Sequence, residues 1–108
     1  MLYGLSEKTI NTLHSIFIKY SGIKQAVLYG SRAKGKFRAG SDIDLTLKTD
    51  NSFSRKNLLC IENDFDDSDL PYFVDISIYE KLSNPDLKAH IDRMGKVLYT
   101  VSQPAKDT

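Results

Sequence analysis

Two aspartates set one residue apart open a strand-like segment of this sequence, and a third lies in a later segment of the same kind. Asp42 and Asp44 begin "DIDLTLK", in which polar and apolar residues alternate. On a β-strand this alternation places both carboxylates on one face, about 6.6 Å apart along the chain. Asp75 lies in "PYFVDISIYE", which alternates in the same way. If the two strands are neighbours, all three carboxylates converge on the face opposite the apolar core.

Clustered carboxylates repel one another, and a hard divalent cation removes that repulsion. Mg²⁺ prefers oxygen ligands and commonly shares them with substrate phosphates. For Asp75 alone, solvation of an open sheet face is an equally simple explanation. That explanation is weaker for Asp42 and Asp44, because aspartate is depleted in strands and like charges on one face cost stability. The pattern therefore predicts a Mg²⁺ site.

A basic, glycine-rich loop, "GSRAKGKFRAGS", directly precedes the acids. Gly30 ends a β-favouring run, "KQAVLYG", and glycine lets backbone N–H groups approach a phosphate closely. Ser31 adds a hydroxyl donor, and Arg32 adds a positive charge. The spacing matches neither a Walker loop nor a Rossmann fingerprint. A solvated basic loop is the alternative, but the position next to the acids favours a phosphate site beside a metal site. Phe37, in the same loop, is expected to pack the loop down.

The spaced motif has a known counterpart. Gly30 and Ser31, ten further residues, Asp-Ile-Asp from Asp42 to Asp44, and a later Asp75 resemble the DNA polymerase beta-like nucleotidyltransferase superfamily. The small size is similar to that of its minimal nucleotidyltransferase (MNT) branch. The resemblance implies a mixed sheet that carries the catalytic acids. It also implies transfer of a nucleoside monophosphate from an NTP to an acceptor hydroxyl, with release of pyrophosphate.

The resemblance also assigns roles to individual positions. It implies that Gly30 and Ser31 hold the β- and γ-phosphates. Arg32, from its positive charge in the same loop, is expected to be a further phosphate contact. Two Mg²⁺ ions would stabilise the attacking and leaving oxygens of an in-line displacement. The implied catalytic residues, which are also the metal ligands, are Asp42, Asp44 and Asp75.

Hydrophobic periodicity and capping residues predict the elements that position these groups. The expected fold class is α+β, with a single mixed β-sheet, helices packed on one face and a nucleotidyltransferase (polymerase beta palm-like) fold by resemblance. Residues 1–101 are expected to form one domain, and residues 102–108 a disordered tail. Three strands are predicted in "KQAVLYG", "DIDLTLK" and "PYFVDISIYE", and an edge strand in "KVLYTV". Three helices are also predicted. The first runs from the cap Ser6 to a stop at Gly22, the second from Ser54 to about Phe65, and the third, capped by Asn84, from Pro85 to Gly95.

Composition limits the kinds of partner, cross-link and location that are expected for the chain. The 108 residues carry a net charge of +1, which gives no global attraction to nucleic acid or to a membrane. The single cysteine, Cys60, excludes an intramolecular disulfide and is expected to be buried in "LLCIE". No secretion signal is recognised at the N-terminus, so a cytoplasmic location is expected.

The chain has little left for an acceptor site once the catalytic core is counted. Its similarity to MNT proteins implies a small helical HEPN-type partner protein, ATP as the donor, AMP transfer to a hydroxyl of that partner, and a hetero-oligomeric antitoxin. Two alternatives stay open. A binding module without turnover would not need all three aspartates, and a catalytic subunit of a small-molecule (antibiotic-type) nucleotidyltransferase would need an acceptor domain. No membrane or nucleic-acid partner is expected.

Overall fold

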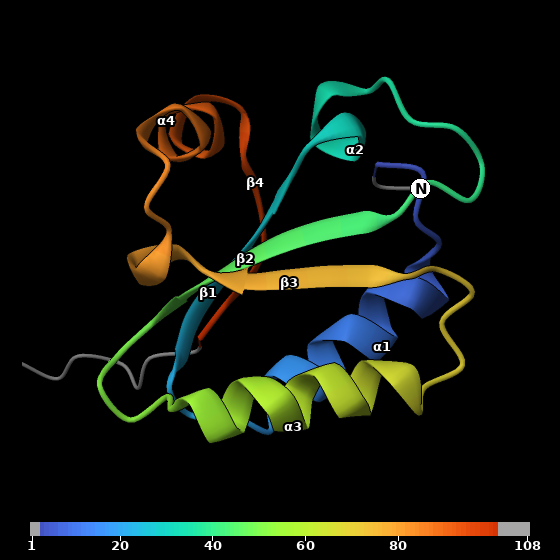
Figure 1. Ribbon diagram of the computed structural model, residues 1–108. Helices are drawn as coiled ribbons and strands as arrows, with labels where there is room; N and C mark the ends of the chain where they lie inside the picture. Colours follow the sequence, from blue (N-terminus) through green and yellow to red (C-terminus); the bar gives the residue numbers. More distant parts are fainter. Residues whose placement is uncertain (1–2, 102–108) are drawn as a thin grey trace, which may run out of the picture.

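A mixed four-stranded sheet forms the centre of the protein (Figure 1). The computed structural model describes residues 3–101. The strand order is β3-β2-β1-β4, with β2 and β3 parallel and β1 antiparallel to both β2 and β4. The predicted mixed sheet with an edge strand at the C-terminal side is confirmed. The strands are β1 (Ile23–Tyr29), β2 (Ile43–Thr49), β3 (Val74–Ile78) and β4 (Lys96–Thr100).

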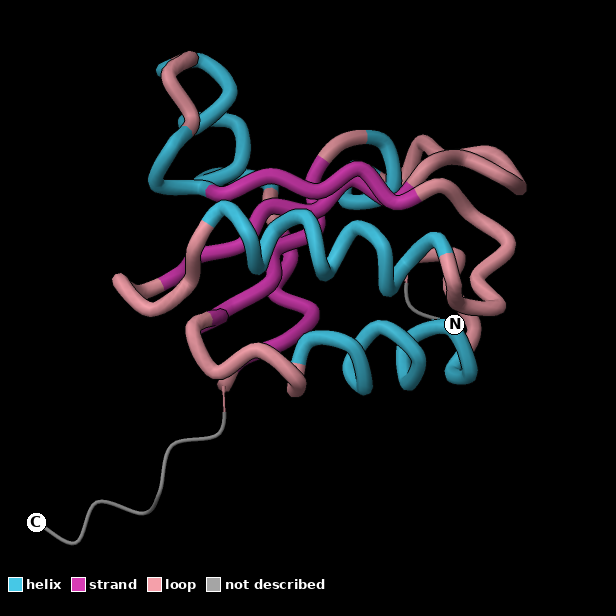
Figure 2. The backbone as a smooth tube through the Cα atoms, turned by 60° about the horizontal axis from the view of Figure 1, so that its bottom comes forward, coloured by secondary structure: helices cyan, strands magenta, loops and turns pink. Residues whose placement is uncertain are grey.

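Two helices, α1 (Glu7–Phe17) and α3 (Arg55–Asp66), lie side by side against one face of the sheet (Figure 2). The rings of Phe17 and Phe65 meet edge to face between them, with centroids 6.0 Å apart. The sheet contributes the inward side chains of β2, as its alternation predicts, and these are completely buried. The strand that carries the aspartates is therefore anchored by its opposite face. Those inward side chains are Ile43, Leu45 and Leu47.

A third helix, α4 (Pro85–Met94), lies on the other side of the sheet, over β1 (Figure 1). Val27 and Ile91 are buried there, outside the main core. Gly95 lies so close to this contact that an added Cβ would be 2.6 Å from Val27. Because α4 lies over β1, the end of the same face where β2 and β3 begin stays open.

Predicted N-caps are confirmed at both ends of the chain. The side chain of Ser6 accepts a hydrogen bond from the Thr9 backbone N–H at 3.1 Å, and Asn84 accepts one from the Asp86 N–H at 2.9 Å. Each cap satisfies a backbone donor that has no partner within the helix. The predicted start of the middle helix is also right, since Ser54 caps α3.

The predicted end of the first helix at Gly22 was wrong, because α1 ends at Phe17. The backbone N–H of Tyr20 donates to the Phe17 carbonyl at 3.0 Å, and the N–H of Ile23 donates to the Tyr20 carbonyl at 3.1 Å. These bonds form successive tight turns that bring the chain directly into β1. The apolar spacing continues past the helix end because the turn also packs on the core.

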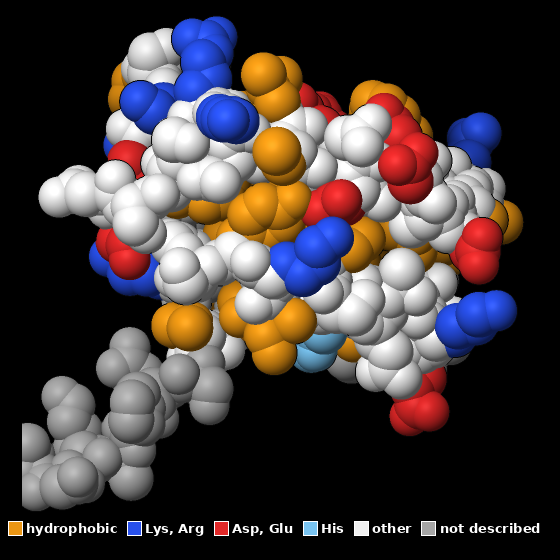
Figure 3. All heavy atoms as spheres, turned by 90° about the horizontal axis from the view of Figure 1, so that it is seen from below, with side chains coloured by type: hydrophobic (Ala, Val, Ile, Leu, Met, Phe, Trp, Pro, Cys, Tyr) orange, Lys and Arg blue, Asp and Glu red, His pale blue; other side chains and the backbone are white. Residues whose placement is uncertain are grey.

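The expected burial of Cys60 was also wrong, because its side chain is exposed. In a helix, adjacent residues point about 100° apart, so an apolar run cannot all face the core. Ile61 and Phe65 take the inward positions of α3, while Leu59 is 62% exposed. Figure 3, which views the molecule from below, shows several hydrophobic side chains among the charged ones on this surface. A single exposed leucine such as Leu59 is normal on a protein surface.

Two further points concern the limits of the chain. Over residues 3–101, no helix has both the length and the apolar character needed to cross a membrane. The predicted tail, residues 102–108, lies outside the described residues.

Candidate active site

The two aspartate-bearing strands are neighbours, as the sequence predicts. In the parallel pairing of β2 with β3, Asp44 lies opposite Asp75. In the antiparallel pairing of β1 with β2, Tyr29 lies opposite Asp44. Residues in register on neighbouring strands point to the same face. Asp42 lies just before β2, is exposed, and is near enough to Asp44 for its charge to raise the pKa of that carboxyl. All three acids therefore gather at the start of β2 and β3.

The acids act on one another electrostatically. Burial raises the pKa of the Asp44 carboxyl above its usual range, and the negative charges of Asp75 and Asp42 raise it further. Within residues 3–101, the single salt bridge joins Lys19 and Asp64, at 3.1 Å. In that part of the chain no lysine or arginine therefore neutralises the three acids.

Gly30 makes room for the Asp44 carboxylate. A Cβ added to Gly30 would lie 2.5 Å from Oδ2 of Asp44, closer than any real contact. The φ of Gly30 is +78°, a conformation that L side chains rarely adopt. The chain then enters the short helix α2 (Ser31–Lys34), whose first backbone N–H groups have no partner within the helix. The predicted phosphate turn and the predicted metal ligand therefore adjoin.

The donor set fits a hard divalent cation by its chemistry. Carboxylate oxygens are the ligands that Mg²⁺ prefers. Burial contributes most to the raised pKa of Asp44, and the neighbouring acids add negative charge that a cation would neutralise. As the side chains lie, however, no three His, Cys, Asp or Glu residues among those described are grouped to hold a metal ion. The acids share a face without forming a complete ligand set.

Tyr29 is a neighbour of the acids that the sequence reasoning missed. Burial raises the pKa of its phenol; a hydrogen bond with Ser77 opposes this, and the charges of Asp75 and Asp44 raise the pKa further. Its ring meets His90 of α4 edge to face, with centroids 6.5 Å apart. Alternation alone places Tyr29 on a face of β1, but only the strand register places it beside Asp44.

Arg32, an expected phosphate contact, lies inside the protein. Its side chain is 2% exposed, and its guanidinium donates to the backbone carbonyls of Ser41 and Tyr3. These contacts favour a supporting role in the loop. The expected packing of Phe37 is confirmed, because its ring lies 5.1 Å from the Arg32 guanidinium carbon.

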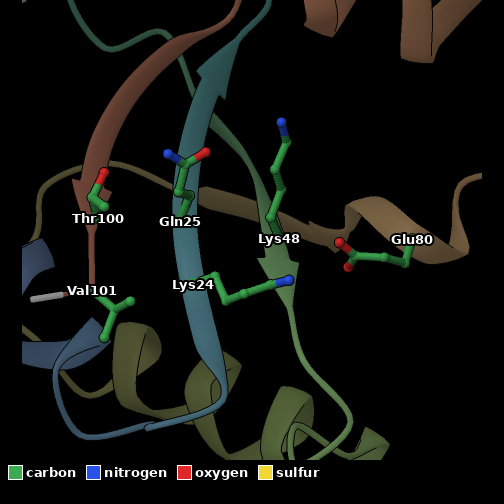
Figure 4. A pocket seen from close by; sticks show the side chains of 6 residues that line it. All are labelled: Lys24, Gln25, Lys48, Glu80, Thr100 and Val101. Carbon is green, nitrogen blue, oxygen red and sulfur yellow. The ribbon is translucent and has the colours of Figure 1, made fainter. Parts of the chain in front are cut away.

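A hollow of about 330 Å³ lies elsewhere on the sheet (Figure 4). Lys48 is part of it and stands four residues beyond Asp44 on β2, about 13 Å along the strand. The hollow is thus separate from the three acids. Its lining residues are Lys24, Gln25, Lys48, Glu80, Thr100 and Val101.

Comparison with solved structures shows the same fold. A crystal structure of a toxin–antitoxin with AMP-PNP has a TM-score of 0.69 at 18% identity, covering 85% of this chain and 73% of that chain. A double aspartate-to-glutamate mutant of the toxin–antitoxin MntA–HpeT has a TM-score of 0.67 at 16% identity, with the same coverage. A putative nucleotidyltransferase from Sulfolobus solfataricus has a TM-score of 0.52 at 14% identity, covering 84% and 76% of the two chains.

Comparison with known sequences identifies the family. No curated protein matches this chain. The family described as "Polymerase beta, Nucleotidyltransferase" matches residues 11–104, which include the glycine turn and all three acids. The chain belongs to the polymerase beta nucleotidyltransferase family.

Proposed function

We propose that the chain transfers AMP from ATP to a hydroxyl group of a partner protein, and that the partner is a small helical protein of the HEPN type. Membership of the nucleotidyltransferase family supports the reaction class. The observation that carries the proposal is the position of the Asp44 carboxylate. It lies against the Gly30 turn on one side and in register with Asp75 on the other.

The donor nucleotide would lie over the start of β2. Gly30 and Ser31 would hold its terminal phosphates through backbone N–H groups and the serine hydroxyl. Asp42, Asp44 and Asp75 would hold Mg²⁺, which supplies the positive charge that offsets the phosphates and the carboxylates. The protein's own contribution is to fix these groups on one sheet face before the reaction. The entropic cost of bringing the reacting groups together in the transition state is then small.

The acceptor would approach from the β3 side. In an in-line displacement the acceptor oxygen forms its bond to the α-phosphorus as the bond to pyrophosphate breaks, so acceptor and leaving group lie on opposite sides. Gly30 follows β1, and Asp75 lies on β3, on the other side of β2. Asp75 would accept the proton from the acceptor hydroxyl. Phe73, which precedes β3, is 65% exposed and offers an apolar contact on that side.

The identity of the partner rests on similarity. Two of the structurally similar proteins are described as toxin–antitoxins, one of them with AMP-PNP, an ATP analogue. A corresponding role for this chain is that of an MNT antitoxin in a cytoplasmic hetero-oligomer. ATP and Mg²⁺ would be its donor and cofactor.

Intact-mass spectrometry of the co-expressed pair tests the proposal. The chain and the proposed small helical partner are incubated with ATP and Mg²⁺. We expect the mass of the partner to rise by one AMP. The change should be absent with Asp42→Asn/Asp44→Asn and retained with Asp66→Asn, a matched change at an exposed aspartate of α3. If nucleotide binds but none of the four NTPs modifies the partner, the chain is a binding module and the proposal fails.

A further inference from the structure

Arg32 is the one arginine or lysine buried in the part of the chain that the structure describes. A buried charge is costly unless hydrogen bonds or an ion pair compensate it. No carboxylate pairs with Arg32 among residues 3–101. Attraction to an acid therefore does not explain why the Arg32 guanidinium is buried next to Gly30 and Ser31.

Main-chain carbonyls compensate the charge instead. The Ser41 carbonyl accepts from Nη2 at 2.7 Å and from Nε at 3.2 Å, and the Tyr3 carbonyl accepts from Nη1 at 3.0 Å. Two aromatic rings also contact the guanidinium, at 5.1 Å for Phe37 and 4.7 Å for Tyr72. The cation is fully enclosed by neutral groups of this chain.

The partners of Arg32 lie next to the proposed site residues. Ser41 directly precedes Asp42, and Tyr72 lies three residues before Asp75, where the chain enters β3. Arg32 itself belongs to α2, directly after the Gly30 turn. One side chain thus ties together the three segments that carry the turn, the paired acids and the third acid.

The N-terminal segment closes the cluster. A Cβ on Gly4 would lie 2.2 Å from the Phe37 ring and 2.9 Å from Nη1 of Arg32. Gly4 also has a φ of +75°. The backbone of this segment therefore covers the guanidinium closely, and little space is left for a phosphate.

We propose that Arg32 is a positioning residue: it fixes the loop from 35 to 41 and the entry to β3, so that Asp42, Asp44 and Asp75 share one site, and it does not contact the nucleotide. This inference rests on the proposed function for its catalytic consequence. Lysine cannot replace arginine here, because the planar guanidinium places two donors on one carbonyl and presents flat faces to aromatic rings.

Limited proteolysis tests the positioning role without any activity. The loop contains trypsin sites at Lys36 and Arg38, both exposed. In Arg32→Lys we expect cleavage at these sites to be at least tenfold faster than in the unchanged chain. Arg55→Lys, the same change at an exposed arginine of α3, should leave the cleavage rate unaltered. Unaltered cleavage in Arg32→Lys would overturn the proposal.

Nucleotide binding and kinetics separate positioning from phosphate contact. In Arg32→Lys, we expect binding of a non-hydrolysable ATP analogue to stay within threefold, while kcat for AMP transfer falls at least tenfold. A tenfold loss of analogue binding with unaltered loop cleavage would show that Arg32 is a phosphate ligand. If the unchanged chain shows no transfer, the proposed function fails, while the proteolysis comparison still decides the positioning role.

A second variant covers the case in which Arg32→Lys does not fold. Phe37→Leu keeps the arginine and its hydrogen bonds but removes one aromatic face of the cluster. We expect cleavage of the loop to be several-fold faster, with analogue binding within threefold. Cleavage at the unchanged rate in a folded Phe37→Leu would contradict the role of the cluster in holding the loop.

Discussion

The carboxylate of Asp44 occupies the space that a side chain on Gly30 would need. A Cβ on Gly30 would lie 2.5 Å from Oδ2 of Asp44. The turn after β1 and the acid on β2 are therefore coupled sterically as well as by sequence spacing.

This coupling predicts the effect of Gly30→Ala. With φ +78° and ψ −152°, Gly30 lies in a region open essentially to glycine alone, so this backbone should cost about 1–3 kcal/mol of stability in the alanine variant. In addition, the new methyl group should displace the Asp44 carboxylate and lower AMP transfer at least about tenfold, equivalent to about 1.4 kcal/mol. Thermal unfolding and initial rates of transfer measure the two effects.

Gly35→Ala is the matched control. Gly35 has a φ of +76°, but an added Cβ there would meet no atom within 4 Å. Gly35 has ψ 14°, in the left-handed helical region, which alanine adopts at lower cost than the conformation of Gly30. We therefore expect a smaller loss of stability, with little change in transfer. Equal losses of transfer in both variants would show that strain in the loop, not the contact with Asp44, determines activity.

The raised pKa of Asp44 predicts how stability depends on pH. Because the native state binds this proton more tightly than the unfolded state, the stability contributed by Asp44 is fully present below the unfolded pKa of about 3.9 and is lost as pH rises through the higher native pKa. Wild type should therefore be less stable than Asp44→Asn at pH 7, and the difference should shrink towards pH 4.

Urea denaturation of both proteins at a series of pH values measures this difference. Mg²⁺ should reduce the difference at pH 7, because it neutralises the acidic group. A constant difference from pH 4 to pH 7 would mean that neither burial nor the other two acids raise the pKa of Asp44 in the folded protein.

Tyr29 should titrate above its ordinary pKa. Burial and the charges of Asp75 and Asp44 raise the pKa of the phenol above 10. The tyrosinate absorbance of wild type minus that of Tyr29→Phe isolates this group. Asp75→Asn removes one negative charge, so it should lower the midpoint. A midpoint that does not move in Asp75→Asn would place Asp75 out of electrostatic reach of Tyr29.

The sequence predicted the elements well where local signals are strong. Ser6 and Asn84 cap helices because their side chains bond backbone donors within the next turn, a purely local interaction. The alternation around Asp44 placed its strand correctly because one face must meet the core. The convergence of Asp44 and Asp75 followed from assuming neighbouring strands, which the parallel register bears out.

The features that the sequence did not predict depend on tertiary packing. The sequence marks Arg32 as a candidate phosphate contact but does not predict its enclosure, because that enclosure requires Tyr3 and Tyr72, which are distant in sequence. Tyr29 became a neighbour of the acids only through the register of β1 with β2. Likewise, no local pattern in the sequence predicts that α4 packs over Val27.

The most direct test of the central claim compares ATP labelled at the α-phosphate with ATP labelled at the γ-phosphate, using the unchanged chain and Asp44→Asn with the partner and Mg²⁺. We predict that the α-label appears on the partner and the γ-label in pyrophosphate. Asp44→Asn should lower this transfer at least about 100-fold. Transfer of the γ-label to the partner, or undiminished α-label transfer by Asp44→Asn, would contradict the account.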